Sequence, residues 1–139
     1  MGSISGIAFG LIAGVIGWTA AEFFGKPIRR GIDLVLDARV EVVRHGNEPA
    51  LTLGRTPIGP KSEHERLKKA QDAFCELGAK FHAFAKTEYI ATRALSLLGL
   101  DLLEAATALI GLSNTMHEYG SASAMFFDRV EHALRFKRD

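Results

Sequence analysis

The hydrophobic pattern begins with an uninterrupted apolar stretch near the N-terminus. No charged side chain lies between Ile4 and Ala21, and Glu22 is the first acidic residue. A helix over Ile4 to Phe24 rises about 1.5 Å per residue and so covers the roughly 30 Å hydrocarbon core of a bilayer. A helix also satisfies its own backbone hydrogen bonds, which lipid cannot do. The pattern therefore predicts a transmembrane helix over residues 1–25.

A cleaved signal peptide is the alternative interpretation, and the charges around the stretch argue against it. A signal peptide carries positive charge before a shorter apolar core and ends at a small-x-small cleavage site. Residues 1–25 contain no Lys or Arg, and Thr19-Ala20-Ala21 is a poor cleavage site. The basic residues follow the span, which by the positive-inside rule puts the N-terminus outside and residues 26–139 in the cytoplasm. The expected interface anchors are Trp18, Phe23, Phe24, Lys26, Arg29 and Arg30.

Small residues recur at every fourth position of the predicted span. This spacing stacks them on one helix face and leaves a flat surface that another helix can approach closely. Single pairs with this spacing are common in membrane helices, whereas a run of four favours helix association. The predicted packing residues are Gly2, Gly6, Gly10 and Gly14, with Ala13, Gly17 and Ala21 on an adjoining strip.

An amphipathic pattern follows the span. Pro27 lacks a backbone donor and predicts a kink or a fresh helix start. Helical spacing then predicts a juxtamembrane helix over residues 26–45, packed on the helical domain rather than lying on the membrane. Residues 46–61 hold three of the four prolines and predict a loop with a short extended piece at 51–53. The apolar side of the juxtamembrane helix is formed by Ile28, Ile32, Val35, Leu36 and Val43.

The remaining residues, 62–139, predict a helical bundle. A capping box from Ser62 to Glu65 opens a helix whose apolar residues alternate by three and four. Glu88 interrupts this register and Thr87 is able to cap a new helix, so a break is expected near 86–88. The predicted seam of the bundle comprises Leu67, Phe74, Leu77, Phe81, Phe84 and Leu95.

The last third of the chain predicts two more helices. Gly99 ends one helix, and Asp101 with Glu104 forms a capping signature for the next. The uncharged run over 105–116 is too short for a second transmembrane pass, so a buried central helix is expected. Within it, Asn114 predicts a buried polar contact that fixes register, with a ligand contact as the alternative. A final helix from about Ser123 is expected to turn Phe127, Val130 and Leu134 inward.

Composition and candidate chemistry exclude several function classes. The formal net charge is only +1, and the sequence shows no basic stripe of the kind that nucleic-acid binders carry. The single Cys75 cannot form an internal disulfide and is expected to be packed. The five histidines show no metal-ligand spacing, and no nucleophile elbow is present. We therefore expect no enzyme activity, no metal and no cofactor.

Two segments carry a resemblance. The first, after the span, reads Phe-Phe-Gly-Lys-Pro-Ile-Arg-Arg over 23–30; the second reads Leu-Ile-Gly-Leu-Ser-Asn-Thr over 109–115, followed by Tyr119-Gly120. Together with the terminal amphipathic helix, they resemble an uncharacterised group of small bacterial single-pass membrane proteins over most of the chain. The resemblance implies a bacterial inner membrane and a one-pass layout. It implies no activity and no functional residues.

The sequence thus predicts an all-α protein with one N-terminal transmembrane helix followed by a small cytoplasmic helical bundle. The function it favours is assembly, as an accessory subunit of a larger membrane complex or as a homo-oligomer. The expected partners are membrane lipid and other membrane protein subunits or copies of the chain itself, and no nucleic acid. The alternative is a pore-forming or membrane-disrupting effector gated by its cytoplasmic domain.

Overall fold

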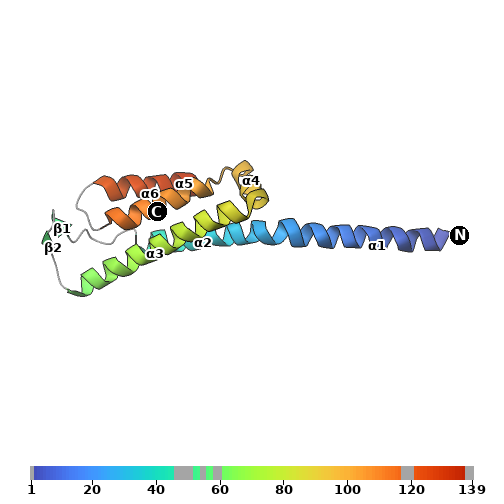
Figure 1. Cartoon of the computed structure of the whole chain (residues 1–139), viewed down its shortest axis with the longest axis horizontal. Coiled ribbons are helices and arrows are strands. Elements are labelled where there is room, and N and C mark those ends of the chain that lie inside the picture. Colours follow the sequence, from blue (N-terminus) through green and yellow to red (C-terminus); the bar gives the residue numbers. More distant parts are fainter. Residues whose placement is uncertain (1, 46–51, 54–55, 58–60, 117–120, 137–139) are drawn as a thin grey trace.

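One long helical rod leads into a bundle (Figure 1). The computed structural model describes residues 2–45, 52–53, 56–57, 61–116 and 121–136. The rod consists of α1 (Gly2–Ala20), the π-helical turn η1 (Ala21–Gly25) and α2 (Lys26–His45), which follow one another without a break. The bundle is built from α2, α3 (Lys61–Thr87), α4 (Tyr89–Leu97), α5 (Leu102–Thr115) and α6 (Ser121–Leu134). The predicted all-α fold is confirmed.

The π-helical turn explains how the rod passes Pro27. In an α-helix, the proline ring collides with the carbonyl group four residues earlier, here that of Phe23. In η1 the amide of Lys26 instead donates to the carbonyl of Ala21, five residues back. This wider turn accommodates the ring and lets the helix continue. Of the two outcomes expected at Pro27, a kink or a fresh helix start, the fresh start is absent, because α1, η1 and α2 form one continuous helix.

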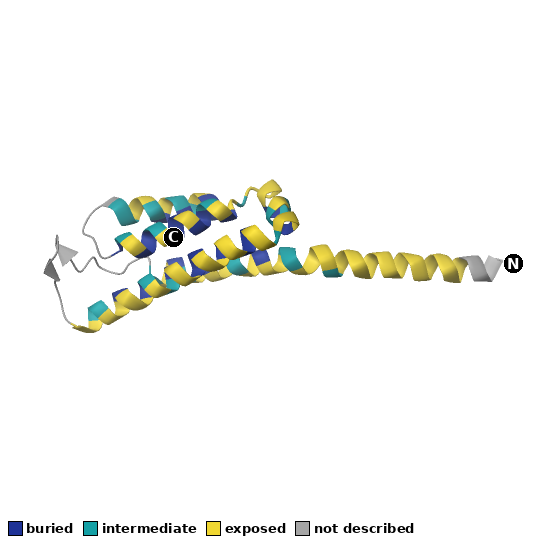
Figure 2. Ribbon diagram, in the orientation of Figure 1, coloured by how far each residue is buried: buried dark blue, intermediate teal, exposed yellow. Residues whose placement is uncertain are grey.

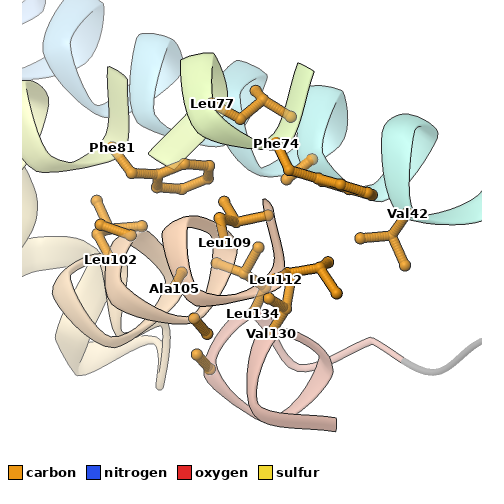
Figure 3. Close-up of a cluster of buried hydrophobic side chains, with 14 of the residues drawn as sticks. Val42, Phe74, Leu77, Phe81, Leu102, Ala105, Leu109, Leu112, Val130 and Leu134 are labelled. Atoms are coloured by element: carbon orange, nitrogen blue, oxygen red, sulfur yellow. The ribbon is translucent and has the colours of Figure 1, made fainter. Parts of the chain in front are cut away.

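The bundle core lies mainly between α3 and α5, with α6 and α2 closing it. Figure 3 shows Phe74 and Phe81 of α3 facing Leu109 of α5, with Val130 of α6 and Val42 of α2 beside them. Phe74 also meets the ring of Phe127 edge-on, with centroids 5.9 Å apart. All six residues of the predicted seam are buried: Leu67, Phe74, Leu77, Phe81, Phe84 and Leu95.

Helix α2 packs on the bundle as expected, but through a face that only partly overlaps the predicted one. The buried residues are Gly31, Ala38 and Val42, whereas Ile32 and Leu36 are exposed. The cause is close approach, because Leu95 and Phe84 occupy the space into which a side chain at Gly31 would point. Small residues allow this contact, so Gly31 and Ala38 face inward. Of the predicted apolar side, Ile28 and Val35 also pack against the core, whereas Ile32, Leu36 and Val43 are exposed.

The helix boundaries largely follow the capping predictions. α3 ends at Thr87 and α4 begins at Tyr89, which confirms the expected break. The Thr87 hydroxyl does not cap α4, because it donates to the carbonyl of Ala83 at 3.0 Å. Asp101 does cap α5, since its carboxylate accepts from the Glu104 amide at 2.9 Å. α3 begins at Lys61, one residue before the predicted cap.

Helix α5 is the buried central helix that the sequence predicts, except at Asn114. That side chain is exposed, and the neighbouring Ser113 is buried instead. The Ser113 hydroxyl donates to the Ile110 carbonyl at 2.8 Å, so it is satisfied within its own helix. Asn114 therefore makes no buried polar contact.

The last helix, α6, is held to α5 by both apolar and charged contacts. Phe127, Val130 and Leu134 are buried, as predicted. Arg129 donates to the Glu104 carboxylate at 2.7 Å, and this hydrogen bond raises the pKa of Arg129 above its ordinary value. In the described part of the connecting loop, β1 (Thr52–Leu53) pairs antiparallel with β2 (Thr56–Pro57). Leu51, also expected to be extended, lies outside the described residues.

Candidate functional site

The candidate site is the apolar helix at the N-terminal end of the rod. Among the described residues, the stretch Gly6–His45 is the one unbent helix long and apolar enough to cross a membrane. None of its apolar window is buried within the chain, whereas the core helix of a soluble protein is mostly covered (Figure 2). α4 and α5 pass the same test together, but they are bent by 94° at their junction.

A shallow groove runs along this helix over the glycines. It has a volume of about 470 Å³. A β-carbon added at Gly6, Gly10, Gly14 or Gly17 meets no atom within 4 Å. These glycines are thus not needed for any contact inside the chain, in contrast to Gly31 in the bundle. The groove is lined by Ile7, Gly10, Leu11, Gly14, Val15 and Trp18.

The other predicted packing residues adjoin this groove along the same helix. Ala13 and Ala21 are exposed, as is Gly17. Gly2 lies in the first turn of α1, and its surroundings are outside the described burial. The structure therefore brings Gly10 and Gly14 together in one groove and leaves the adjoining strip open.

The predicted interface anchors surround the π-helical turn and the start of α2. Trp18, Phe23 and Phe24 are exposed on the rod. Lys26 forms an ion pair with Glu22 one turn earlier, so the first charged residue of the chain is matched by a base. Arg29 and Arg30 are both exposed. Aromatic rings followed by bases are typical of a helix leaving a bilayer on its cytoplasmic side.

Sequence reasoning missed two exposed apolar surfaces. The first is the α2 strip, formed by Ile32, Leu36, Val40 and Val43. The sequence predicted that Ile32, Leu36 and Val43 of this strip lie on the packed side, because a helical pattern identifies the apolar side but not the side that packs. Gly31 and Ala38, seven residues apart on another face, were the available signal for close packing. The second surface lies on α4.

Another hollow lies at the end of α6. It has a volume of about 660 Å³ and is widely open. Asp128 and His132 contribute to it, but in the described part of the chain no three His, Cys, Asp or Glu side chains cluster to hold a metal. Cys75, expected to be packed, is exposed on α3. The lining residues are Gly99, Asp128, Glu131, His132, Arg135 and Phe136.

The comparisons with known proteins give no indication of function, so function is inferred from the site. No family model, no curated protein and no solved structure matches this chain. Fold alone does not determine function, which is argued from the chemistry of a site. The features available for that argument are the uncovered apolar helix, its glycine groove and the unbroken helical continuation into α2.

Proposed function

We propose that this chain is a non-enzymatic, membrane-anchored assembly protein that associates through its transmembrane helix. One observation carries the proposal: the glycine groove of α1 is empty of side chains from the chain itself. In lipid, helices associate through close packing of small residues rather than through the hydrophobic effect. A groove over Gly10 and Gly14 fits the ridge of a second transmembrane helix, either of another subunit or of another copy.

The rod extends this association surface beyond the membrane. α1 and α2 are joined by η1 without a break, so a partner helix aligned on α1 continues alongside α2. The α2 strip (Ile32, Leu36, Val40 and Val43) remains exposed after the bundle has formed. Its spacing of three and four residues is that of a helix–helix contact. The strip supports assembly with a helical partner in the cytoplasm as well as in the bilayer.

The charges support one orientation. Bases at Lys26, Arg29 and Arg30 follow the span, and residues 1–25 carry none. We infer that the N-terminus faces outward and the bundle lies in the cytoplasm, in keeping with a single-pass protein of a bacterial inner membrane. Fusion reporters at either terminus test this orientation, and a reporter active outside at the C-terminus would contradict it.

Leucine substitutions in the groove test the association directly. Gly6→Leu, Gly10→Leu and Gly14→Leu fill open space, so they leave the monomer intact while blocking close helix approach. We expect the triple variant to lose its signal in a membrane two-hybrid assay for self-association or for a copurified partner. The matched control is Ala8→Leu, Ile12→Leu and Ile16→Leu on the opposite face, which should keep the signal. An unchanged signal in the groove variant would refute the proposal.

Purification in a mild detergent separates the two forms of assembly. Copurifying subunits in fixed proportion indicate an accessory role, whereas a larger species of this chain alone indicates a homo-oligomer. Loss of either species in the groove variant links it to α1. A monomer without partners, combined with membrane depolarisation on expression, would contradict assembly and favour the pore-forming alternative.

A further inference from the structure

Helix α4 lies across the end of the bundle from which α1 departs (Figure 1). It is packed there against α2, where its Leu95, together with Phe84 of α3, covers Gly31. Gly31 follows Gly25, the end of the predicted span, by six residues, or about 9 Å along a helix. The polar headgroup layer is of comparable depth. If α1 crosses the bilayer, as the proposed function requires, α4 therefore lies at the level of the headgroups.

The direction of α4 fits a membrane surface. Its axis makes an angle of 94° with α5. Figure 1 shows α5 running along the bundle in the general direction of the rod, so α4 lies across that direction. A bilayer crossed by α1 is therefore roughly parallel to α4.

The outer face of α4 is apolar and uncovered. Leu97 is 83% exposed, the highest value among the large apolar side chains of the described residues. Tyr89 and Ile90 are 72% and 59% exposed. Ile90 and Leu97 are seven residues apart and share one face, while Ala91 and Leu95 are buried against the bundle. One face of the helix is thus buried in the protein core, whereas the opposite apolar face is exposed and is available to an apolar environment outside the chain.

The charge on this face suits a lipid surface. Arg93 is the one charged residue between Tyr89 and Leu97, and it is exposed. Arg29 and Arg30 are exposed nearby on α2, within the two residues before Gly31. Basic side chains beside apolar ones bind lipid phosphates while their neighbours enter the acyl boundary.

The end of α6 holds α4 in this position. The guanidinium of Arg135 donates to the Leu98 carbonyl at 3.1 Å, and the Asp101 amide donates to the Ala133 carbonyl at 2.9 Å. Both ends of the junction between α4 and α5 are therefore tied to α6. The apolar face is presented by a fixed element rather than by a loose segment.

We propose that α4 is a membrane-surface helix. Its outer face is formed by Tyr89, Ile90, Arg93 and Leu97. This face lies at the boundary between headgroups and acyl chains, in the leaflet on the same side of the membrane as the bundle. The bilayer thus contacts the bundle at a second place besides the transmembrane helix. This second contact fixes the orientation of the bundle against the membrane.

Lipid quenching of a site-specific fluorophore tests the proposal. The full chain carries Cys75→Ser and one new cysteine, labelled with an environment-sensitive dye and reconstituted in phosphatidylcholine–phosphatidylglycerol vesicles. Labels at Ile90→Cys and Leu97→Cys should lose emission when lipids with a nitroxide near the headgroup are added. An exposed control should keep it: Glu65→Cys near the start of α3, far from α1 (Figure 1).

A label inside the span separates this proposal from the proposed anchoring. Val15→Cys should be quenched by nitroxides deep in the acyl region. If Val15→Cys is quenched and Leu97→Cys is not, α4 does not contact lipid and only the surface-helix proposal is refuted. If neither is quenched, the anchoring fails and the surface helix fails with it. Shielding of Leu97→Cys from aqueous iodide without lipid quenching would show a protein partner on α4 and would also refute the proposal.

Discussion

At the scale of single residues, glycine has opposite roles in the two halves of the chain. In α1 a β-carbon at Gly10 or Gly14 meets nothing within 4 Å. At Gly78 in α3 the same atom would lie 2.7 Å from Cγ1 of Ile110 and 3.1 Å from the Ala106 carbonyl oxygen. Gly78 therefore permits α3 and α5 to cross closely, whereas the α1 glycines keep a surface open.

This contrast predicts that Gly78→Ala destabilises the bundle. Overpacking a tight core contact costs about 1–3 kcal/mol. The better helix propensity of Ala offsets up to about 1 kcal/mol of that. We expect a net loss of stability in thermal unfolding in detergent. The control is Ala79→Gly at the next, exposed position, which measures the propensity effect alone. A Gly78→Ala variant more stable than the parent would show that the crossing is looser than described.

At the scale of elements, the end of α6 sets the geometry of its neighbours. Arg135 has a left-handed backbone, with φ of 54°, and the Phe136 amide donates to the Glu131 carbonyl at 3.0 Å. Such a helix end usually carries glycine, because a side chain is strained there. Gly99 opposite has φ of 82°, and the Arg135 guanidinium lies where its side chain would be. The strained Arg135 is thus the residue that binds the junction between α4 and α5, through its hydrogen bond to the Leu98 carbonyl.

Two variants at Arg135 separate strain from hydrogen bonding. Both Arg135→Ala and Arg135→Gly lose the hydrogen bond to Leu98, but only glycine relieves the left-handed backbone. We expect Arg135→Gly to be more stable than Arg135→Ala by about 1 kcal/mol. Chemical unfolding in the same detergent measures the difference. Equal stability of the two variants would mean that the backbone at this position is not strained in solution.

The elements show which features the sequence was able to predict and which it was not. The seam from Leu67 to Phe84 follows from local spacing within one helix, and the Asp101 cap follows from local chemistry. The packed face of α2 does not, because Gly31 is selected by Leu95 and Phe84, which are distant in sequence. Nor does the 94° turn after α4, which depends on Gly99 and on contacts with α6.

At the scale of the whole molecule, the candidate site also combines features that were predictable from local sequence with features that were not. The apolar length, the glycine spacing and the bases after the span are local properties, so the span was predictable residue by residue. The exposed apolar faces of α2 and α4 depend instead on which side of each helix packs in the folded bundle, and this is set by contacts between residues distant in sequence. The α2 strip continues from the predicted membrane span along the rod, whereas α4 lies across the end of the bundle from which α1 departs.

The composition of the core also leads us to expect that the bundle folds without the membrane anchor, residues 1–25. Among the residues whose burial is described, α1 and η1 contribute none to the buried core, whereas α2 contributes Ala38 and Val42. Residues 26–139 retain every core residue that the structure describes, and Pro27 is well tolerated in the first turn of a new helix. We expect this fragment to unfold at nearly the same temperature as the full chain in the same detergent, within about 0.5 kcal/mol of stability.

A shorter fragment provides the contrast, because α2 belongs to the bundle although it continues the membrane helix. Residues 46–139 lack Val42 and Ala38 and leave Phe84 and Leu95 without their cover at Gly31. Uncovering these side chains should lower the unfolding temperature clearly, since each loses apolar contacts and gains water. If the fragment 26–139 is destabilised as much as 46–139, the span supports the fold itself. If only the shorter fragment is destabilised, the span serves the membrane and its partners while α2 links it rigidly to the bundle.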